Sequence, residues 1–151
     1  VMPYTEKNDG NVRWWRMKGA GQNWNNDMPP ARFIKMTTYN LKRDKSSDFF
    51  RFWRNNVKLQ KALGYSGVSG VFMLESGGQA YQVMEVEGYN SHAEGKGAFK
   101  NQDVNYIEEY NKMFGWRSHR NDQAAFNASI EQWGIIIETA ELKPEMSSKL
   151  K

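Results

Sequence analysis

The sequence predicts an α+β fold in which helices cover one side of an antiparallel sheet. The clearest signal is the segment 68–86, where two strand-like runs meet at Gly77 and Gly78. A Gly-Gly pair can take positive φ at both central positions of a tight turn, so it predicts a β-hairpin. A strand-like run and a helix-like run precede the hairpin, and a helix-like run and a strand-like run follow it. This order, βαββαβ, is typical of a ferredoxin-like sandwich with a four-stranded antiparallel sheet.

Residues 32–41 form the first predicted strand and residues 47–63 the first predicted helix. The helix has apolar side chains near a 3.6-residue period, as expected where one face packs on a sheet. Ser46 or Ser47 is predicted to cap its start, because a serine hydroxyl accepts a hydrogen bond from a free backbone N–H there. Gly64 is predicted to follow its last turn, where glycine readily adopts the left-handed conformation.

The segment after the hairpin is less regular. Glycines in residues 88–100 predict an irregular segment, and residues 104–114 predict an amphipathic helix closed by Gly115. The connection 116–132 has no assigned form. Residues 133–140 predict an apolar last strand. Apolar residues predicted to fill the core or an interface are Ile34, Met36, Phe72, Leu74, Met84, Val86, Ile135 and Ile137.

Three segments divide the chain: an N-terminal aromatic arm (1–30), the ferredoxin-like domain (31–141) and a polar tail (142–151). The arm contains Trp14, Trp15 and Trp24. Because a tryptophan gains much by covering apolar surface, we expect the arm to pack on the domain or on a partner subunit.

Composition limits the class of protein. A chain of 151 residues is long enough for one domain with its own core. No apolar run approaches the ~20 residues that span a bilayer, so we expect a soluble, cytoplasmic protein with no membrane partner. The absence of cysteine excludes disulfides, thiolate catalysis and zinc–thiolate sites.

Charge is unevenly distributed along the chain. Residues 1–64 contain thirteen Lys/Arg against five Asp/Glu, a net charge of +8, and residues 65–151 contain eight against twelve, a net charge of −4. The basic half, with aromatic residues at 13–16, could bind single-stranded nucleic acid by stacking and charge. Compensation within the fold or across a dimer explains the asymmetry more simply, and the third strand lacks the basic-aromatic motif of RNA-recognition domains.

Two segments resemble a known family. Residues 38–42 (Thr-Tyr-Asn-Leu-Lys) end the first strand, and residues 49–53 (Phe-Phe-Arg-Phe-Trp) lie in the helix before the long hairpin. The order of the elements and these two segments are similar to those of the dimeric α+β barrel superfamily. That superfamily includes antibiotic-biosynthesis-monooxygenase-like, stress-responsive A/B barrel and NIPSNAP-like proteins. The resemblance covers about residues 31–141.

The resemblance implies a homodimer whose two sheets pack face to face. It also implies a small pocket between the sheet and its helices in each subunit, for hydrophobic and often aromatic or polyketide-like molecules, or for haem. Catalysis without a cofactor is common among the oxygenase-like members. Trp53 and His92 match the haem-degrading members only by rough location and no partner asparagine is found, so no cofactor is expected.

Candidate site residues follow from these expectations. Histidine suits general-base chemistry near neutral pH, and His92 follows the third strand where the resemblance places the lip of the pocket. Tyr81 or Tyr89 would polarise a carbonyl or phenol beside it. Alternatively, His92 is an exposed loop residue, and His119 is interpreted as a surface residue. The residues predicted to line the pocket are Tyr39, Phe49, Trp53, Tyr89 and Phe99.

Three carboxylates, Glu75, Glu85 and Glu87, fall near the hairpin. Paired carboxylates can act as acid and base if one is buried, but solvation at an edge or ion pairs with Lys35 or Arg54 are simpler interpretations. No spacing of histidines and carboxylates predicts a metal site.

Three functions therefore remain open. The first is a small-molecule enzyme or binder for a hydrophobic carbonyl- or phenol-bearing ligand, acting as a cofactor-independent oxygenase, cyclase or isomerase. The second is a non-catalytic homo-oligomeric interaction module. The third is a single-stranded nucleic-acid binder. The sequence leaves open whether the chain is an enzyme.

Overall fold

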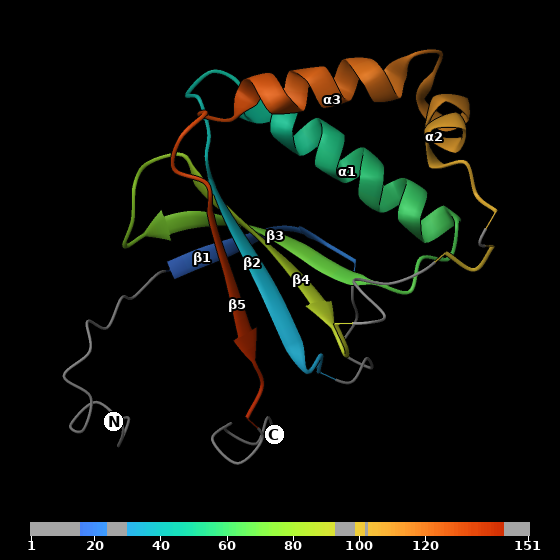
Figure 1. The fold of residues 1–151 in the computed structure, drawn as a ribbon. Coiled ribbons are helices and arrows are strands. Elements are labelled where there is room, and N and C mark those ends of the chain that lie inside the picture. Colours follow the sequence, from blue (N-terminus) through green and yellow to red (C-terminus); the bar gives the residue numbers. More distant parts are fainter. Residues whose placement is uncertain (1–15, 24–29, 93–98, 102, 144–151) are drawn as a thin grey trace.

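One antiparallel sheet with helices forms the fold in the computed structural model, which describes residues 16–23, 30–92, 99–101 and 103–143 (Figure 1). The strands are ordered β1-β3-β4-β2-β5 across the sheet. In chain order the elements are β1 (Arg16–Gln22), β2 (Phe33–Asn40), α1 (Ser46–Ala62), β3 (Val68–Ser76), β4 (Gln82–Tyr89), α2 (Tyr106–Phe114), α3 (Ser118–Ser129) and β5 (Ile136–Glu141). The α+β class is confirmed, but the sheet has five strands where four were predicted.

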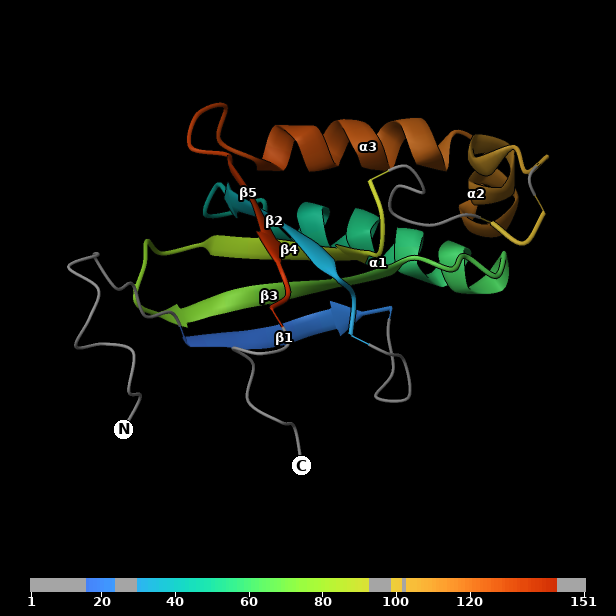
Figure 2. The same ribbon diagram turned by 60° about the horizontal axis from the view of Figure 1, so that its bottom comes forward.

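The helices lie on one face of the sheet. Figure 2 shows α1 and α3 on the same side, and α2 packs against both of them. Side chains alternate between the two faces of a strand. Tyr39 packs on Phe49 of α1, so odd-numbered residues of β2 face the helices, together with their cross-strand partners on β4. No described element covers the opposite face, which we call the open face.

The two strands of the hairpin pair as predicted, but the turn between them differs from the predicted one. β3 and β4 are antiparallel, with Val71 opposite Glu85 and Met73 opposite Val83. The connection comprises residues 77–81 rather than a two-residue Gly-Gly turn. Gly77 has a φ of 95°, and the second positive φ falls on Tyr81 at 62°, not on Gly78. Pairing thus stops before the glycines, and the chain turns over a wider loop.

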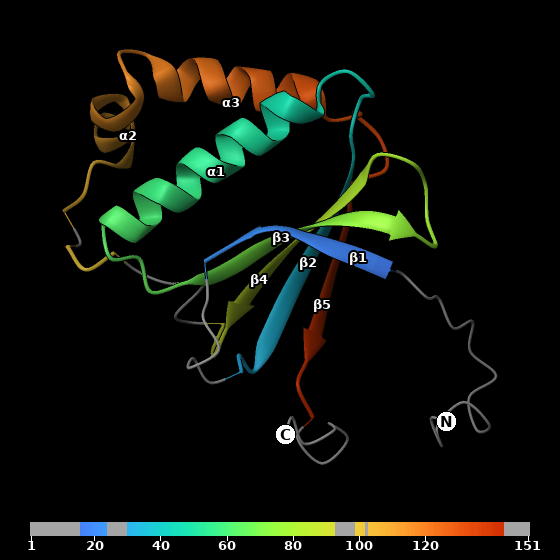
Figure 3. The same cartoon turned by 180° about the vertical axis from the view of Figure 1, so that it is seen from behind.

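The fifth strand, β1, lies within the segment interpreted as an arm. It pairs with β3 at one edge of the sheet (Figure 3), and its register shifts around Gly19 and Gly21. Glycine weakens a strand signal because it has no side chain to pack, which explains why the strand was missed. Trp14, Trp15 and Trp24 lie outside the described residues.

Helix α3 occupies the connection to which no form was assigned. Of its residues only Ser129 is fully buried and its surface is mostly polar, so its apolar period is weak.

The boundaries of other elements differ slightly from the predicted ones. Lys45, not a serine, precedes α1 and no side chain caps it, which corrects that prediction. The predicted glycine after α1 is confirmed, since Gly64 has a φ of 64°. The last strand begins only at Ile136.

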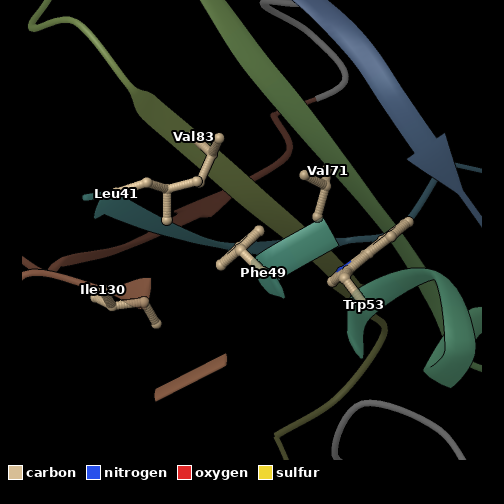
Figure 4. Packing of buried hydrophobic residues seen from close by; sticks show 6 residues of the cluster. All are labelled: Leu41, Phe49, Trp53, Val71, Val83 and Ile130. Carbon is tan, nitrogen blue, oxygen red and sulfur yellow. The ribbon is translucent and has the colours of Figure 1, made fainter. Parts of the chain in front are cut away.

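The core lies between the sheet and the helices. It joins Leu41, Phe49, Trp53, Val71, Val83 and Ile130 (Figure 4). Phe49 is fully buried, and its ring centroid lies 4.9 Å from that of Phe126 on α3 and 5.4 Å from that of Tyr39 on β2. One aromatic side chain thus links α1, α3 and the sheet, which holds the helices at a fixed height above the strands.

Candidate functional site

A cavity of about 150 Å³ lies between α1 and the helix-facing side of β3 and β4. We call it the Glu85 cavity. Its apolar lining residues are Phe52, Trp53, Val57, Val68 and Phe126, and its polar ones are Asn56, Gln60, Tyr65, Ser69, Glu85 and Glu87. A cavity of ~150 Å³ is large enough for a molecule the size of benzene. The polar groups in it therefore determine which single-ring molecules it would accept.

Two hydrogen bonds position the Glu85 carboxylate. The Tyr39 hydroxyl donates to Oε2 at 3.1 Å, and the Trp53 indole Nε1 donates to Oε1 at 3.2 Å. Burial and the negative charge of Glu85 raise the pKa of Tyr39 well above its ordinary value. Tyr39 is therefore a neutral donor at physiological pH. Bonds from two elements hold the carboxylate of Glu85 in place.

The second carboxylate, Glu87, lies two residues further along the same face of β4. Its Oε2 lies 3.8 Å from Nζ of Lys35 on the neighbouring strand, which confirms one of the two predicted ion-pair partners. Glu85 and Glu87 both line the cavity. Since ionised carboxylates only accept hydrogen bonds, the sheet side of the cavity offers acceptors.

The α1 side of the cavity presents one buried acceptor, on Gln60. Gln60 Oε1 is buried and has no hydrogen-bond partner among the described residues. The Asn56 side chain is engaged at both ends, because Nδ2 donates to the Phe52 carbonyl at 3.0 Å and Oδ1 accepts from the Tyr106 hydroxyl. A buried acceptor left unpaired is costly, and a donor on a bound molecule would satisfy Gln60.

The predicted ligand-binding residues are partly brought together here. Trp53 lines the cavity, and Tyr39 reaches it through Glu85. Phe99 packs beside Tyr65, a lining residue, with 5.0 Å between ring centroids. Phe49 instead lies within the core and is fully buried.

The two predicted catalytic residues are not brought together. Tyr81 precedes β4 and His92 follows it, so they lie at opposite ends of an eight-residue strand. Tyr89 is the tyrosine close to His92, with 5.3 Å between ring centroids, and Phe33 packs on the same histidine at 4.6 Å. None of these four residues lines the Glu85 cavity. Their catalytic and binding roles stay predictions.

His119 is half-buried rather than a surface residue, which corrects that interpretation. The centroid of its ring lies 5.2 Å from that of Tyr110 and 5.9 Å from that of Phe52.

Gln60 was not predicted from the sequence, because a glutamine in a charged helix carries no signal of burial. Glu85 was singled out, but its donors Tyr39 and Trp53 come from elements whose packing the sequence does not specify.

The described residues restrict other functions. Within them, no group of three or more His, Asp or Glu side chains could hold a metal ion. None of their helices is both long and apolar enough to cross a bilayer. In the nucleic-acid hypothesis, residues 13–15 lie outside the described ranges, and Arg16 Nε lies 3.0 Å from Glu75 Oε2. That ion pair competes with any phosphate for the arginine.

Comparison with known proteins adds no assignment. No protein-family model matches the chain, and a search of curated proteins finds no match either.

Proposed function

We propose that this chain binds a small hydrophobic molecule with one ring and a hydrogen-bond donor, such as a phenolic hydroxyl, in the Glu85 cavity. The observation that carries the proposal is the unpaired, buried Gln60 Oε1 in a cavity that also contains two carboxylates. Aromatic and aliphatic walls favour an apolar ring, and three acceptors favour a donor on it.

Of the two ligand classes expected from the sequence, the phenol fits this cavity better than the carbonyl. The buried lining atom without a partner among the described residues is an acceptor, Gln60 Oε1. The Trp53 and Asn56 N–H groups already donate to Glu85 and to the Phe52 carbonyl, so a donor on the ligand gains more here than a carbonyl oxygen does. A phenol can donate to Gln60 or to a carboxylate without breaking these bonds. The same carboxylates are placed to accept a proton from a bound molecule, the step that a cofactor-independent isomerase or oxygenase requires.

Titration calorimetry with phenol and with anisole, which has the same ring but no hydroxyl donor, tests the proposal. We expect phenol to bind more tightly than anisole. The variant Gln60→Leu removes the acceptor at similar volume, so it should weaken phenol binding by about tenfold, the value of one hydrogen bond. Anisole binding should not change.

Gln123→Leu is the matched control, because Gln123 is exposed on α3 and does not line the cavity. It should leave both affinities unchanged. Equal affinity for phenol and anisole, or an unchanged phenol affinity in Gln60→Leu, would refute the proposed site.

A second candidate, a homo-oligomeric module, is favoured by the open face. The order β3-β4-β2-β5 among four of the five strands supports a ferredoxin-like arrangement and, with it, the resemblance to dimeric α+β barrels. Register places apolar residues from several strands on this face. Met84 is buried among them, and the partly exposed ones are Ile34, Met36, Phe72, Leu74 and Val86. Apolar side chains in one contiguous area are typical of a subunit interface. We propose that two copies pair through it.

A further inference from the structure

A second concave site lies on the open face, at the end of the sheet where β4 begins. We call it the amide groove. It has a volume of about 370 Å³ and is lined by Thr38, Asn40, Gln79, Gln82, Trp133 and Gly134, among others. Figure 1 shows the loop between β3 and β4 lying beside the connection from α3 to β5, and these two segments supply its sides. Small-molecule sites typically measure ~300–1,000 Å³, so the groove has room for one ligand.

The polar lining of the groove is neutral. None of the described residues that line it is charged, and three of them are carboxamides. A carboxamide offers both a donor and an acceptor, as does the Thr38 hydroxyl. Such a surface matches a molecule whose groups also donate and accept, and provides no countercharge for an ion.

Thr38 gives the second, independent sign of a ligand. Its side chain is buried, with 4% of the residue exposed, yet its Oγ1 has no hydrogen-bond partner within the described residues. Thr38 lines the groove, and a bound molecule would reach this hydroxyl by displacing the side chains that cover it. Buried hydroxyls are nearly always paired in native proteins, so one that has no partner among the described residues is a candidate contact for a bound molecule.

Hydrogen bonds hold two of the three carboxamides, Asn40 and Gln82, in place. Asn40 Nδ2 donates to the Gly134 carbonyl and Gln82 Nε2 donates to Asn40 Oδ1, each at 3.2 Å. A Cβ on Gly134 would lie 2.5 Å from Asn40 Nδ2, and one on Gly78 would lie 2.5 Å from Gln82 Oε1. Glycine at both positions therefore leaves room for the amides, and the pair is fixed before any ligand arrives.

Trp133 supplies a flat apolar surface beside these polar groups. It is 73% exposed, although tryptophan gains more than most residues by burial. The C–H bonds on one face of a sugar ring can pack on an indole by dispersion and weak C–H···π contacts. The hydroxyls at the edge of the same ring would meet the amides and Thr38.

The geometry points to a neutral polyhydroxy compound, a sugar ring or a similar polyol, as the ligand of the amide groove. Recognition would come from the Thr38 hydroxyl, the Asn40–Gln82 amide pair and the face of Trp133. The Glu85 cavity shares no lining residue with this groove and lies on the opposite face of the sheet. The proposal for the Glu85 cavity and the proposal for the amide groove can therefore succeed or fail independently.

Saturation-transfer NMR on the full chain, with D-glucose, D-galactose and maltose as probes, tests this inference. We expect saturation transfer to at least one neutral sugar, with a Kd of about 1 mM or tighter, and none to the charged analogue glucuronate. Thr38→Val removes the hydroxyl at nearly constant shape and should weaken binding at least tenfold. Trp133→Ala should weaken it by at least the same factor.

Trp116→Ala is the matched control, because Trp116 is 79% exposed but does not line the groove. It should leave sugar binding unchanged. Absence of transfer to all three sugars overturns the inference, as does equal binding by the wild type and Thr38→Val when both are folded by circular dichroism. It is also overturned if Thr38→Val or Trp133→Ala changes self-association and not sugar binding, since the groove would then contact a second copy.

Discussion

Tyrosine hydroxyls connect neighbouring strands and neighbouring helices at individual points. Tyr39 donates to Glu85 beside the cavity, Tyr106 donates to Asn56 on α1, and Tyr110 donates to Asp122 on α3 at 2.9 Å. Burial is the first cause that raises the pKa of each of these phenols. All three therefore stay protonated where an exposed tyrosine would ionise.

Alkaline unfolding provides a test at this scale. Burial raises the pKa of Tyr106 from 10.0 to about 12. Between these values the unfolded chain loses the proton while the native chain keeps it, so the free energy of unfolding falls as pH rises. Below pH 10 this contribution is fully present. Urea unfolding at about pH 9 and about pH 11 should show the decrease, and Tyr106→Phe should lessen it. The same decrease in wild type and variant would contradict the assignment.

The sequence identifies some individual site residues but not the contacts between them. Glu85 and Trp53 were identified from residue type and position, but the hydrogen bond between them depends on how α1 crosses β4, which no local pattern encodes. The resemblance placed His92 at the lip of the pocket with Tyr81 or Tyr89 beside it, and ten residues separate Tyr81 from His92. An extended strand occupies most of that interval, and it places them at opposite ends.

At the scale of elements, Asp122 joins three helices through one carboxylate. Arg51 Nε donates to its Oδ1 at 3.0 Å, and Asn55 Nδ2 and the Tyr110 hydroxyl donate to its Oδ2 at 3.1 and 2.9 Å. Thus α1, α2 and α3 meet at a residue whose side chain is only 14% exposed. Apart from Phe126, which packs on the core, α3 contributes few apolar residues, so these polar bonds add to its attachment.

We therefore expect Asp122→Ala to lower the free energy of unfolding by about 2–4 kcal/mol, because three donors lose a charged acceptor in a partly buried place. Urea denaturation followed by circular dichroism measures this change. Asp103→Ala, at an exposed position, should stay within about 0.5 kcal/mol of the wild type. Similar small losses in both variants would show that α3 does not depend on Asp122.

Element prediction succeeded where local patterns and tertiary packing agree. The period of α1 and the alternation of β3 and β4 come from burial on one side, and both elements formed close to their predicted bounds. α3 and β1 were missed because their stability comes from partners distant in sequence: Asp122 bonds to α1, and β1 pairs with β3. The residue pattern of a short segment contains little information about such long-range contacts.

For the whole molecule, the two faces of the sheet carry different features. The helix-facing side contains the core and the Glu85 cavity, and the open face contains the amide groove and the apolar residues of the proposed pairing surface. A stable interface between two copies needs at least ~1,000 Å² of buried surface in total. The open face extends over five strands, so it is a candidate for a contact of this size.

A charge introduced on the open face by substitution tests the proposed dimer. Met36→Glu would bury a carboxylate in an apolar contact, so it should weaken self-association at least a hundredfold. Analytical ultracentrifugation of the wild type and this variant measures the effect. Ile107→Glu, at a 54% exposed position on α2, is the matched control and should leave association unchanged. A monomeric wild type would rule out the pairing.

The edge position of β1 has a further consequence. This strand pairs with β3 alone, through a register interrupted twice, while the core residues lie in later elements. It can therefore detach in a local opening that costs less free energy than global unfolding. The backbone amides of β3 would then become a vacant template, and an extended segment of another polypeptide could take the place of β1 by strand exchange.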